Sequence, residues 1–300
     1  MTTMRRKAVL SMIAIWPIIL LAAPAVLVVV AACGDRALAQ SRLEAGYTIT
    51  FARIPVGTIV AAVELGASDY TMSTAGHAGI RSLLTGEAAF ATRGAVKDGR
   101  VIPVSFTSRI ASGDENLNVT MVLNQGTVEK LIITPQPANN RIPITDADRR
   151  GILDPLSAFL IPDGVIATNL GTSLSQDACQ RTLPIFDGLQ RYDLRLAFKR
   201  IDHVAAGKGY AGKSYAGPTL VCSLSYQAIS GHSASTPLVK YLTEGREMEI
   251  AFAPIAGTRM LAPFQVSVMS MLANLVIKAD RFVSSGPAVD APPANSNGRQ

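Results

Sequence analysis

Residues 207–214 read GKGYAGKS and match the pattern of a phosphate-binding P-loop letter for letter. A working P-loop leaves a strand and opens a helix, whose first backbone N–H groups face the phosphate. Here Gly217 and Pro218 follow, which break a helix, and residues 220–227 then alternate apolar and polar as a strand does. We therefore predict a β-hairpin tip rather than a nucleotide site at the motif residues, Gly207, Gly212, Lys213 and Ser214.

A second motif could suggest hydrolase chemistry. Ser230-Gly231-His232-Ser233 places a hydroxyl next to an imidazole, but sequence neighbours on a loop seldom have the geometry of a catalytic triad. The G-x-S-x-G nucleophile elbow does not occur in the sequence. Nor do the three histidines, His77, His203 and His232, stand at metal-ligand spacing from one another or from a cysteine. We expect neither an enzyme nor a metal or cofactor site.

Five charged residues stand within or beside apolar segments and are the polar groups that could orient a ligand. They could lie at the mouth of a cavity and bind a ligand head group, or they could form ion pairs and turn hydrogen bonds at strand ends. The sequence leaves both interpretations open for Asp154, Asp187, Arg191, Arg246 and Arg259.

Outside the first forty residues the chain has two cysteines, Cys179 and Cys222. An even pair in an oxidising compartment predicts a disulfide, and two buried free thiols are the alternative.

The N-terminal segment has the three parts of a secretory signal peptide. A cationic start at Arg5, Arg6 and Lys7 precedes an apolar run over residues 8–32 and a small-residue exit at 37–39. This pattern predicts export to the periplasm, with residues 1–39 removed by cleavage between Ala39 and Gln40. Two alternatives stay open: acylation of Cys33 as a membrane-anchored lipoprotein, and an uncleaved anchor, since the run is long enough to span a bilayer.

Charge gives little reason to expect a nucleic-acid partner. The chain carries a formal net charge of +6, and half of that excess belongs to residues 1–39. No cluster of lysine and arginine remains after them, and Trp16, the single tryptophan, lies in the leader.

The elements that must position these residues are mostly strands. Apolar and polar residues alternate with a period of two over many stretches, which is typical of antiparallel sheets with one buried face. Turn sequences separate them at residues 97–100, 124–126 and 256–258. We predict ten to twelve strands and two or three short helices, over residues 78–85, 148–160 and 236–242. The predicted fold is mainly β: one large, strongly curved antiparallel sheet, forming an open or half β-barrel.

The predicted organisation is a signal peptide (1–39), a single β-rich domain (40–283) and a disordered tail (284–300). The tail is rich in Pro, Ser and Asn and has almost no apolar bulk.

Several fragments together resemble a family of exported proteins common in alphaproteobacteria, the domain-of-unknown-function family numbered 3108. The resemblance covers roughly residues 43–283, and its most recognisable fragments are GYTITFARIPVGTIVAAVELGASDY, DPLSAFLIP, CQRTLPIFDGLQRYDL, YAGPTLVC and GREMEIAFAPIAGTRMLAPFQV. The family brings no established activity. In broad plan it is similar to periplasmic lipoprotein carriers, in which a curved sheet half-wraps an apolar cavity, and this is an analogy of fold alone.

These features define two main hypotheses. The first is a periplasmic protein that binds or carries an apolar, lipid-like ligand in a half-barrel cavity. The alternative is a structural or assembly protein of the cell envelope that acts through protein partners, with its core filled by its own side chains. A hydrolase is the least favoured of the functions considered.

Overall fold

The computed structural model describes residues 40–80, 84–136, 141–163, 174–206, 214–233, 242, 247–269 and 274–287. All of them belong to one compact unit, residues 36–300. The predicted cleavage site is described only from Gln40 onwards, while Ala39 and Cys33 lie outside the described residues, as does the predicted tail from residue 288 on.

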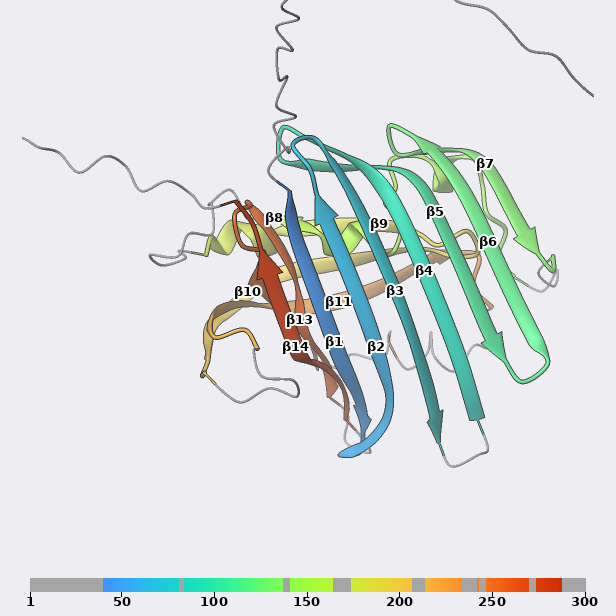
Figure 1. Ribbon diagram of the computed structural model, residues 1–300. Coiled ribbons are helices and arrows are strands. Elements are labelled where there is room, and N and C mark those ends of the chain that lie inside the picture. The colour runs from blue at the N-terminus through green and yellow to red at the C-terminus, as the bar shows by residue number, and fades with distance from the viewer. Residues whose placement is uncertain are drawn as a thin grey trace, which may run out of the picture. The chain divides into compact units, whose positions relative to one another are not determined.

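The described residues form one antiparallel sheet of fourteen strands, which is not closed. The first seven strands form a meander of consecutive hairpins, coloured blue to green in Figure 1: β1 (Ser41–Phe51), β2 (Ile54–Leu65), β3 (Asp69–Ile80), β4 (Leu84–Lys97), β5 (Arg100–Ser112), β6 (Glu115–Asn124) and β7 (Thr127–Thr134). The others are β8 (Ile161–Pro162), β9 (Arg181–Phe186), β10 (Arg191–Val204), β11 (Gly217–Ser230), β12 (Glu247–Pro254), β13 (Met260–Met269) and β14 (Leu275–Ser285).

Strands β9 to β14 also pair in chain order and form a second meander. The two meanders meet where β1 pairs with β14, so that the sheet runs from β7 at one edge to β9 at the other. The short β8 pairs with β13 off this path. The prediction of a mainly β fold with one large antiparallel sheet is confirmed. Strand β14 extends to Ser285, into the segment expected to be a tail.

The predicted helices are wrong where the structure describes them. Residues 78–85 include the end of β3 and the start of β4. The short side chains of Ala and Gly fit a helix or a strand, and the pairing between β3 and β4 favours the strand. Residues 148–160 contain only single 3-10 turns, η1 (Ala147–Arg149) and η2 (Ser157–Phe159), and a third turn, η3 (Gln176–Cys179), lies elsewhere. Of the third predicted helix, only Leu242 is among the described residues.

We call inner the face of β1–β6 that carries Leu43, Val63, Met72, Phe106 and Met121, all buried, and outer the opposite face. Paired positions make these residues one row across six strands, and the member on β4 is Thr92. A threonine in an otherwise apolar buried row needs a hydrogen-bond partner.

Residues 141–163 supply that partner and connect the two edges of the sheet. Ile152 N donates to Gly126 O (3.0 Å) in the β6–β7 turn. Leu153 N donates to Pro184 O (2.8 Å) and Leu153 O accepts from Phe186 N (3.0 Å), both on β9. The segment thereby spans the opening between β7 and β9, and its apolar side chains complete the core clusters on either side.

Candidate functional site

A cleft of about 650 Å³ lies between the start of β5, the β6–β7 turn, residues 151–162 and the start of β9. Its floor is apolar and consists of side chains that are themselves buried, so the cleft is shaped by the packed core rather than by mobile surface groups. These floor residues are Ile152, Ala158, Leu160, Ile161 and Leu183.

Polar groups are few and lie at defined places around this floor. Among the described residues that line the cleft, the charged ones are Arg100 and Arg181, both cationic. Arg100, Gln125 and Thr182 are exposed at the rim, whereas Arg181 is partly buried. An apolar surface with a small number of convergent polar groups is the usual composition of a small-molecule site.

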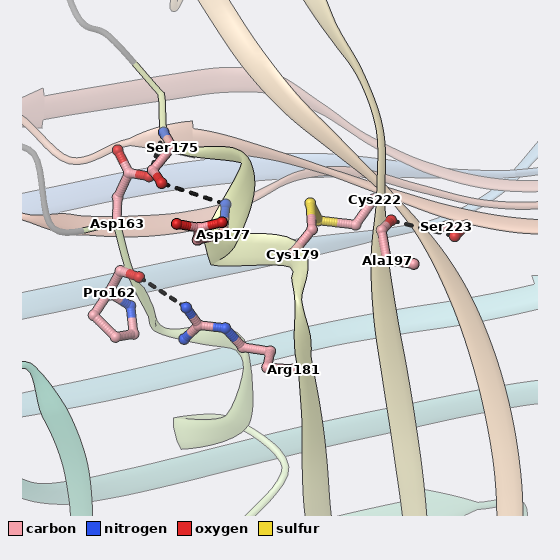
Figure 2. Close-up of a disulfide and its surroundings, with 9 residues drawn as sticks. All are labelled: Pro162, Asp163, Ser175, Asp177, Cys179, Arg181, Ala197, Cys222 and Ser223. Atoms are coloured by element: carbon pink, nitrogen blue, oxygen red, sulfur yellow. Dashed lines mark hydrogen bonds between the residues drawn. A yellow bond between two sulfur atoms is a disulfide. The ribbon is translucent and has the colours of Figure 1, made fainter.

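The guanidinium of Arg181 is fixed by neighbouring backbone. One Nη donates to Pro162 O (3.1 Å), as Figure 2 shows, while the Nε is buried without a hydrogen-bond partner. Burial lowers the pKa of Arg181, and the nearby Asp163 carboxylate opposes this effect.

Asp163 does not complete the hydrogen bonding of Arg181. Its Oδ1 accepts from Ser175 N (2.9 Å), and its Oδ2 is buried without a partner. Burial raises the pKa of Asp163, whereas the bond from Ser175 and the charge of Arg181 lower it. Two oppositely charged groups therefore lie near each other with unused hydrogen-bonding capacity on both.

The predicted disulfide is present and lies next to this group. Cys179, at the end of η3, is bonded to Cys222 on β11, with a sequence separation of 43 residues. Both half-cystines are fully buried. Because Arg181 begins β9 only two positions after Cys179, the bond anchors the segment that carries Arg181 to the central strands (Figure 2).

Beneath the cleft floor lies a buried polar network centred on Asp154, whose exposed fraction is 0%. Its Oδ1 accepts from the backbone N–H groups of Leu156 and Ser157, both at 3.0 Å. Its Oδ2 accepts from Thr92 Oγ1 (2.9 Å) and from the Ser157 hydroxyl, which also bonds the Tyr70 hydroxyl (2.6 Å). Burial raises the pKa of Asp154, and these hydrogen bonds oppose the shift.

This network joins the 151–163 segment to the inner face of β3 and β4. Ser157 lines the cleft, but it is only 1% exposed, and its hydroxyl is hydrogen-bonded to Asp154, Thr92 and Tyr70. A nucleophilic serine needs a base and access to substrate. The arrangement of Ser157 is that of a structural tether.

The other polar residues singled out from the sequence lie elsewhere. Asp187 accepts from Leu189 N (2.8 Å) and Gln190 N (2.7 Å) in the β9–β10 turn, and burial raises its pKa. Arg191 donates to Asp193 at 2.6 Å. Arg259 is exposed beside β13, and Arg246 lies outside the described residues. None of these, nor Asp154, is among the described residues that line the cleft.

Ser230 and His232 do not form a nucleophile–base pair, because neither the Ser230 hydroxyl nor His232 Nδ1, both buried, has a hydrogen-bond partner. Of the P-loop-like motif only Ser214 is described, but β10 and β11 on its two sides pair antiparallel, from Val204 with Gly217 onwards. The motif therefore leads into a strand and not into the helix that a P-loop requires.

The part of the chain that the structure describes contains no group of three His, Cys, Asp or Glu side chains that could hold a metal ion. It also contains no helix with the length and hydropathy needed to cross a membrane.

Sequence reasoning did not find the cleft residues. Arg100, Ser157 and Arg181 are far apart in the chain and belong to no motif. The available signals were the Asp98-Gly99 turn before Arg100 and the position of Arg181 two residues after a cysteine, and neither indicates a cleft.

Fold and cleft together define an open, mainly antiparallel β-sheet protein with an amphipathic surface cleft. The chain belongs to the family described as protein of unknown function (DUF3108), whose model matches residues 46–273. No curated protein matches the chain. Among solved structures, the chain is similar to the crystal structure of a β-barrel-like protein of domain of unknown function DUF1849 from Brucella abortus. The two sequences are 10% identical, the TM-score is 0.44, and the match covers 83% of this chain and 98% of that chain.

Proposed function

We propose that this chain is an exported protein of the periplasm or cell envelope that binds or carries an apolar, lipid-like ligand, and that the cleft between β5 and β9 is the binding site. Export is inferred from the leader sequence, with the Cys33 lipoprotein as the alternative form. The observation that carries the proposal of binding is the mainly apolar lining of the cleft, which adds partly exposed side chains, among them Val101, Leu153 and Pro184, to the buried floor.

The dimensions of the cleft support a small ligand. Small-molecule sites commonly enclose roughly 300–1,000 Å³, and the cleft, at about 650 Å³, falls within this range. Its floor is rigid, because the 151–163 segment is bonded to β6–β7, to β9 and, through Asp154, to β4. A preformed site loses little free energy to ordering when a ligand binds.

The test uses residues 40–300 and the neutral fluorophore N-phenyl-1-naphthylamine, displaced by dodecanol. We expect the fluorophore to bind the protein, and Thr182→Trp, which fills the rim of the cleft, to weaken binding at least tenfold. The matched control is Ser225→Trp, an exposed position on β11 that does not line the cleft, and it should bind as the unmodified protein does. If the fluorophore does not bind, or binds all three proteins equally, the cleft is not the site.

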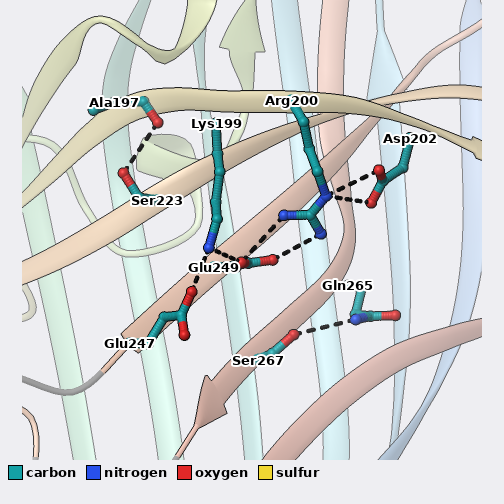
Figure 3. Close-up of polar contacts among 9 residues, drawn as sticks. All are labelled: Ala197, Lys199, Arg200, Asp202, Ser223, Glu247, Glu249, Gln265 and Ser267. Carbon is teal, nitrogen blue, oxygen red and sulfur yellow. Dashed lines mark hydrogen bonds and ion pairs between the residues drawn. The ribbon is translucent and has the colours of Figure 1, made fainter.

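One observation favours the alternative, a structural or assembly protein. A hollow of about 830 Å³ crosses the outer face from β14 and β1 to β6, and its centre carries short uncharged side chains. The polar surface of β10–β12 is different, because long charged side chains there bond one another, as Figure 3 shows for Lys199, Arg200 and Glu249. The contrast suggests that β1–β6 are covered by a partner rather than by water.

Charge indicates what that partner would carry. Arg42 and Arg281 both pair with Glu44, and Arg109 donates a hydrogen bond to the neutral Asn118. The hollow therefore has a net positive charge and fits an acidic protein segment.

Complementation of a strain that lacks the gene separates the two functions. If Ala89→Arg in the hollow abolishes resistance to envelope stress while Thr182→Trp in the cleft preserves it, the assembly function replaces the carrier function. The reverse result supports the carrier function.

A further inference from the structure

We infer that the ligand of the cleft carries an anionic head group, a carboxylate or a phosphate, and that Arg181 binds it. The inference rests on the proposed function, because it names the chemical class of the ligand for the same cleft.

The first observation is the sign of the charges. Arg100 at the rim and Arg181 deeper in the cleft are the charged groups among its described lining residues, and no described carboxylate lines it. A site whose charged wall has one sign concentrates ligands of the opposite sign. A neutral ligand would gain weaker hydrogen bonds from these guanidinium groups than an anion would, and a cationic ligand would be repelled.

The second observation is independent of net charge. Arg181 Nε is buried and has no hydrogen-bond partner, although a buried guanidinium N–H left without an acceptor is unfavourable. The neighbouring Asp163 does not use this donor, since its own Oδ2 also lacks a partner. An oxygen atom of a bound anion would supply the missing acceptor.

The type of side chain narrows the chemistry further. A guanidinium presents a planar fork of donors that matches the two oxygens of a carboxylate or phosphate, which a lysine cannot reproduce. One end of the fork is held by Pro162 O, so the orientation of the remaining donors is set before the ligand arrives. The apolar floor, formed by residues such as Ile152 and Leu183, accommodates the hydrocarbon part, and the ligand is therefore an anionic amphiphile.

The experiment compares four dodecyl compounds that differ only in the head group. Dodecanoate, dodecyl phosphate, dodecanol and dodecyltrimethylammonium, each below its micellar concentration, displace N-phenyl-1-naphthylamine from residues 40–300. We expect at least one of the two anions to displace the fluorophore at a concentration at least tenfold lower than the alcohol or the cation. The comparison of dodecanoate with dodecyl phosphate shows whether a fatty-acid carboxylate or a phospholipid-type head group is preferred.

Variants assign the preference to one residue. Arg181→Gln should remove the preference for the anions over dodecanol, and Arg181→Lys should retain only part of the preference. The matched control is Arg195→Gln, which removes an arginine on β10 that bonds Gln227 and does not line the cleft, and the preference should persist. If Arg181→Gln does not fold because Asp163 loses its nearby cation, the double variant Arg181→Gln with Asp163→Asn takes its place.

The outcomes separate the two proposals. If all four compounds compete equally, the head-group inference is overturned while the binding function stands. If none displaces the fluorophore, the proposed function itself fails. If Arg195→Gln reduces the preference as much as Arg181→Gln, the preference comes from overall charge and the assignment to Arg181 is wrong.

Discussion

Asp154 offers the sharpest test of how the fold is held together, because two substitutions at this one position should differ strongly in their effect. Asp154→Ala leaves the buried N–H groups of Leu156 and Ser157 without their acceptor and removes one acceptor of the Ser157 hydroxyl. Each unsatisfied buried group costs about 1–3 kcal/mol, and the loss of stability should be on the order of 4 kcal/mol.

Asp154→Asn preserves the pattern of hydrogen bonds. The amide oxygen accepts from the same two N–H groups, and the amide nitrogen donates to Ser157 and Thr92. Thr92 can donate to Ser105 O (3.0 Å) instead, and Ser157 can donate to Tyr70, since either hydroxyl of that pair can be the donor. We expect a change within about 1 kcal/mol at neutral pH.

The effect of pH has a definite sign. Burial raises the pKa of Asp154, so the native state binds this proton more tightly than the unfolded chain does. The resulting stabilisation is complete below about pH 4, the pKa of an unfolded aspartate, and is lost as pH rises through the native pKa. The Asp154→Asn variant cannot titrate at this position, and its stability relative to the unmodified protein should therefore increase with pH.

Urea unfolding of the three proteins between pH 4 and pH 8 measures these differences. Comparing variant with unmodified protein removes the contributions of Asp163 and Asp187, whose pKa values burial also raises. If Asp154→Asn destabilises the protein at pH 7 as strongly as Asp154→Ala does, the negative charge itself is required and the interpretation of Asp154 as a neutralisable tether is refuted.

Two further predictions concern the sheet. A Cβ at Gly231, where φ is +77°, would lie 1.9 Å from Leu189 O. We therefore expect Gly231→Ala to abolish folding or to lower the melting temperature sharply. The control is Gly113→Ala, at φ +57° with open space around it, which should cost only about 1 kcal/mol of backbone strain. Glu249→Gln removes the carboxylate that Lys199 and Arg200 share (Figure 3), while Lys199 keeps Glu247 and Arg200 keeps Asp202. Because both cations are exposed, the free energy of unfolding should change by no more than about 1 kcal/mol, and by less at high salt; a larger, salt-independent loss would contradict this.

Much of the sheet could be predicted because its strands have one buried and one wet face. The alternation of Leu117, Val119, Met121 and Leu123 with polar residues corresponds to the burial pattern of β6. β3 and β4 are less visible in the sequence, because many positions on both of their faces are Ala, Gly, Ser or Thr and give the period of two little contrast. For the same reason residues 78–85 suggested a helix.

The cleft could not be predicted, because it depends on how the ends of the sheet meet. Arg100 and Arg181 come together only because the 151–163 segment spans from the β6–β7 turn to β9. Asp154 did stand out in the sequence as a charge beside apolar residues, and in the structure it is buried. The sequence signal does not distinguish a ligand-binding carboxylate from one that accepts hydrogen bonds from Ser157, Thr92 and Leu156, because both are aspartates within apolar segments.

The disulfide connects the stability of the fold to the chemistry of the cleft. In the chain-entropy model a loop of this length gives about 4 kcal/mol, and the double replacement Cys179→Ser with Cys222→Ser should lower the free energy of unfolding by that order. The bond also anchors η3, from which Arg181 follows directly, whereas the apolar floor at residues 152–161 is held by other contacts.

The same double replacement should therefore affect the two parts of a ligand unequally. At a temperature where the variant is folded, we expect its preference for an anionic dodecyl compound over dodecanol to fall severalfold, while dodecanol still competes at the same concentration. Chemical reduction of the unmodified protein should give the same result, because it breaks the same bond. If the preference survives both treatments, the bond from Arg181 to Pro162 O is sufficient to orient the guanidinium, and the disulfide acts on stability alone.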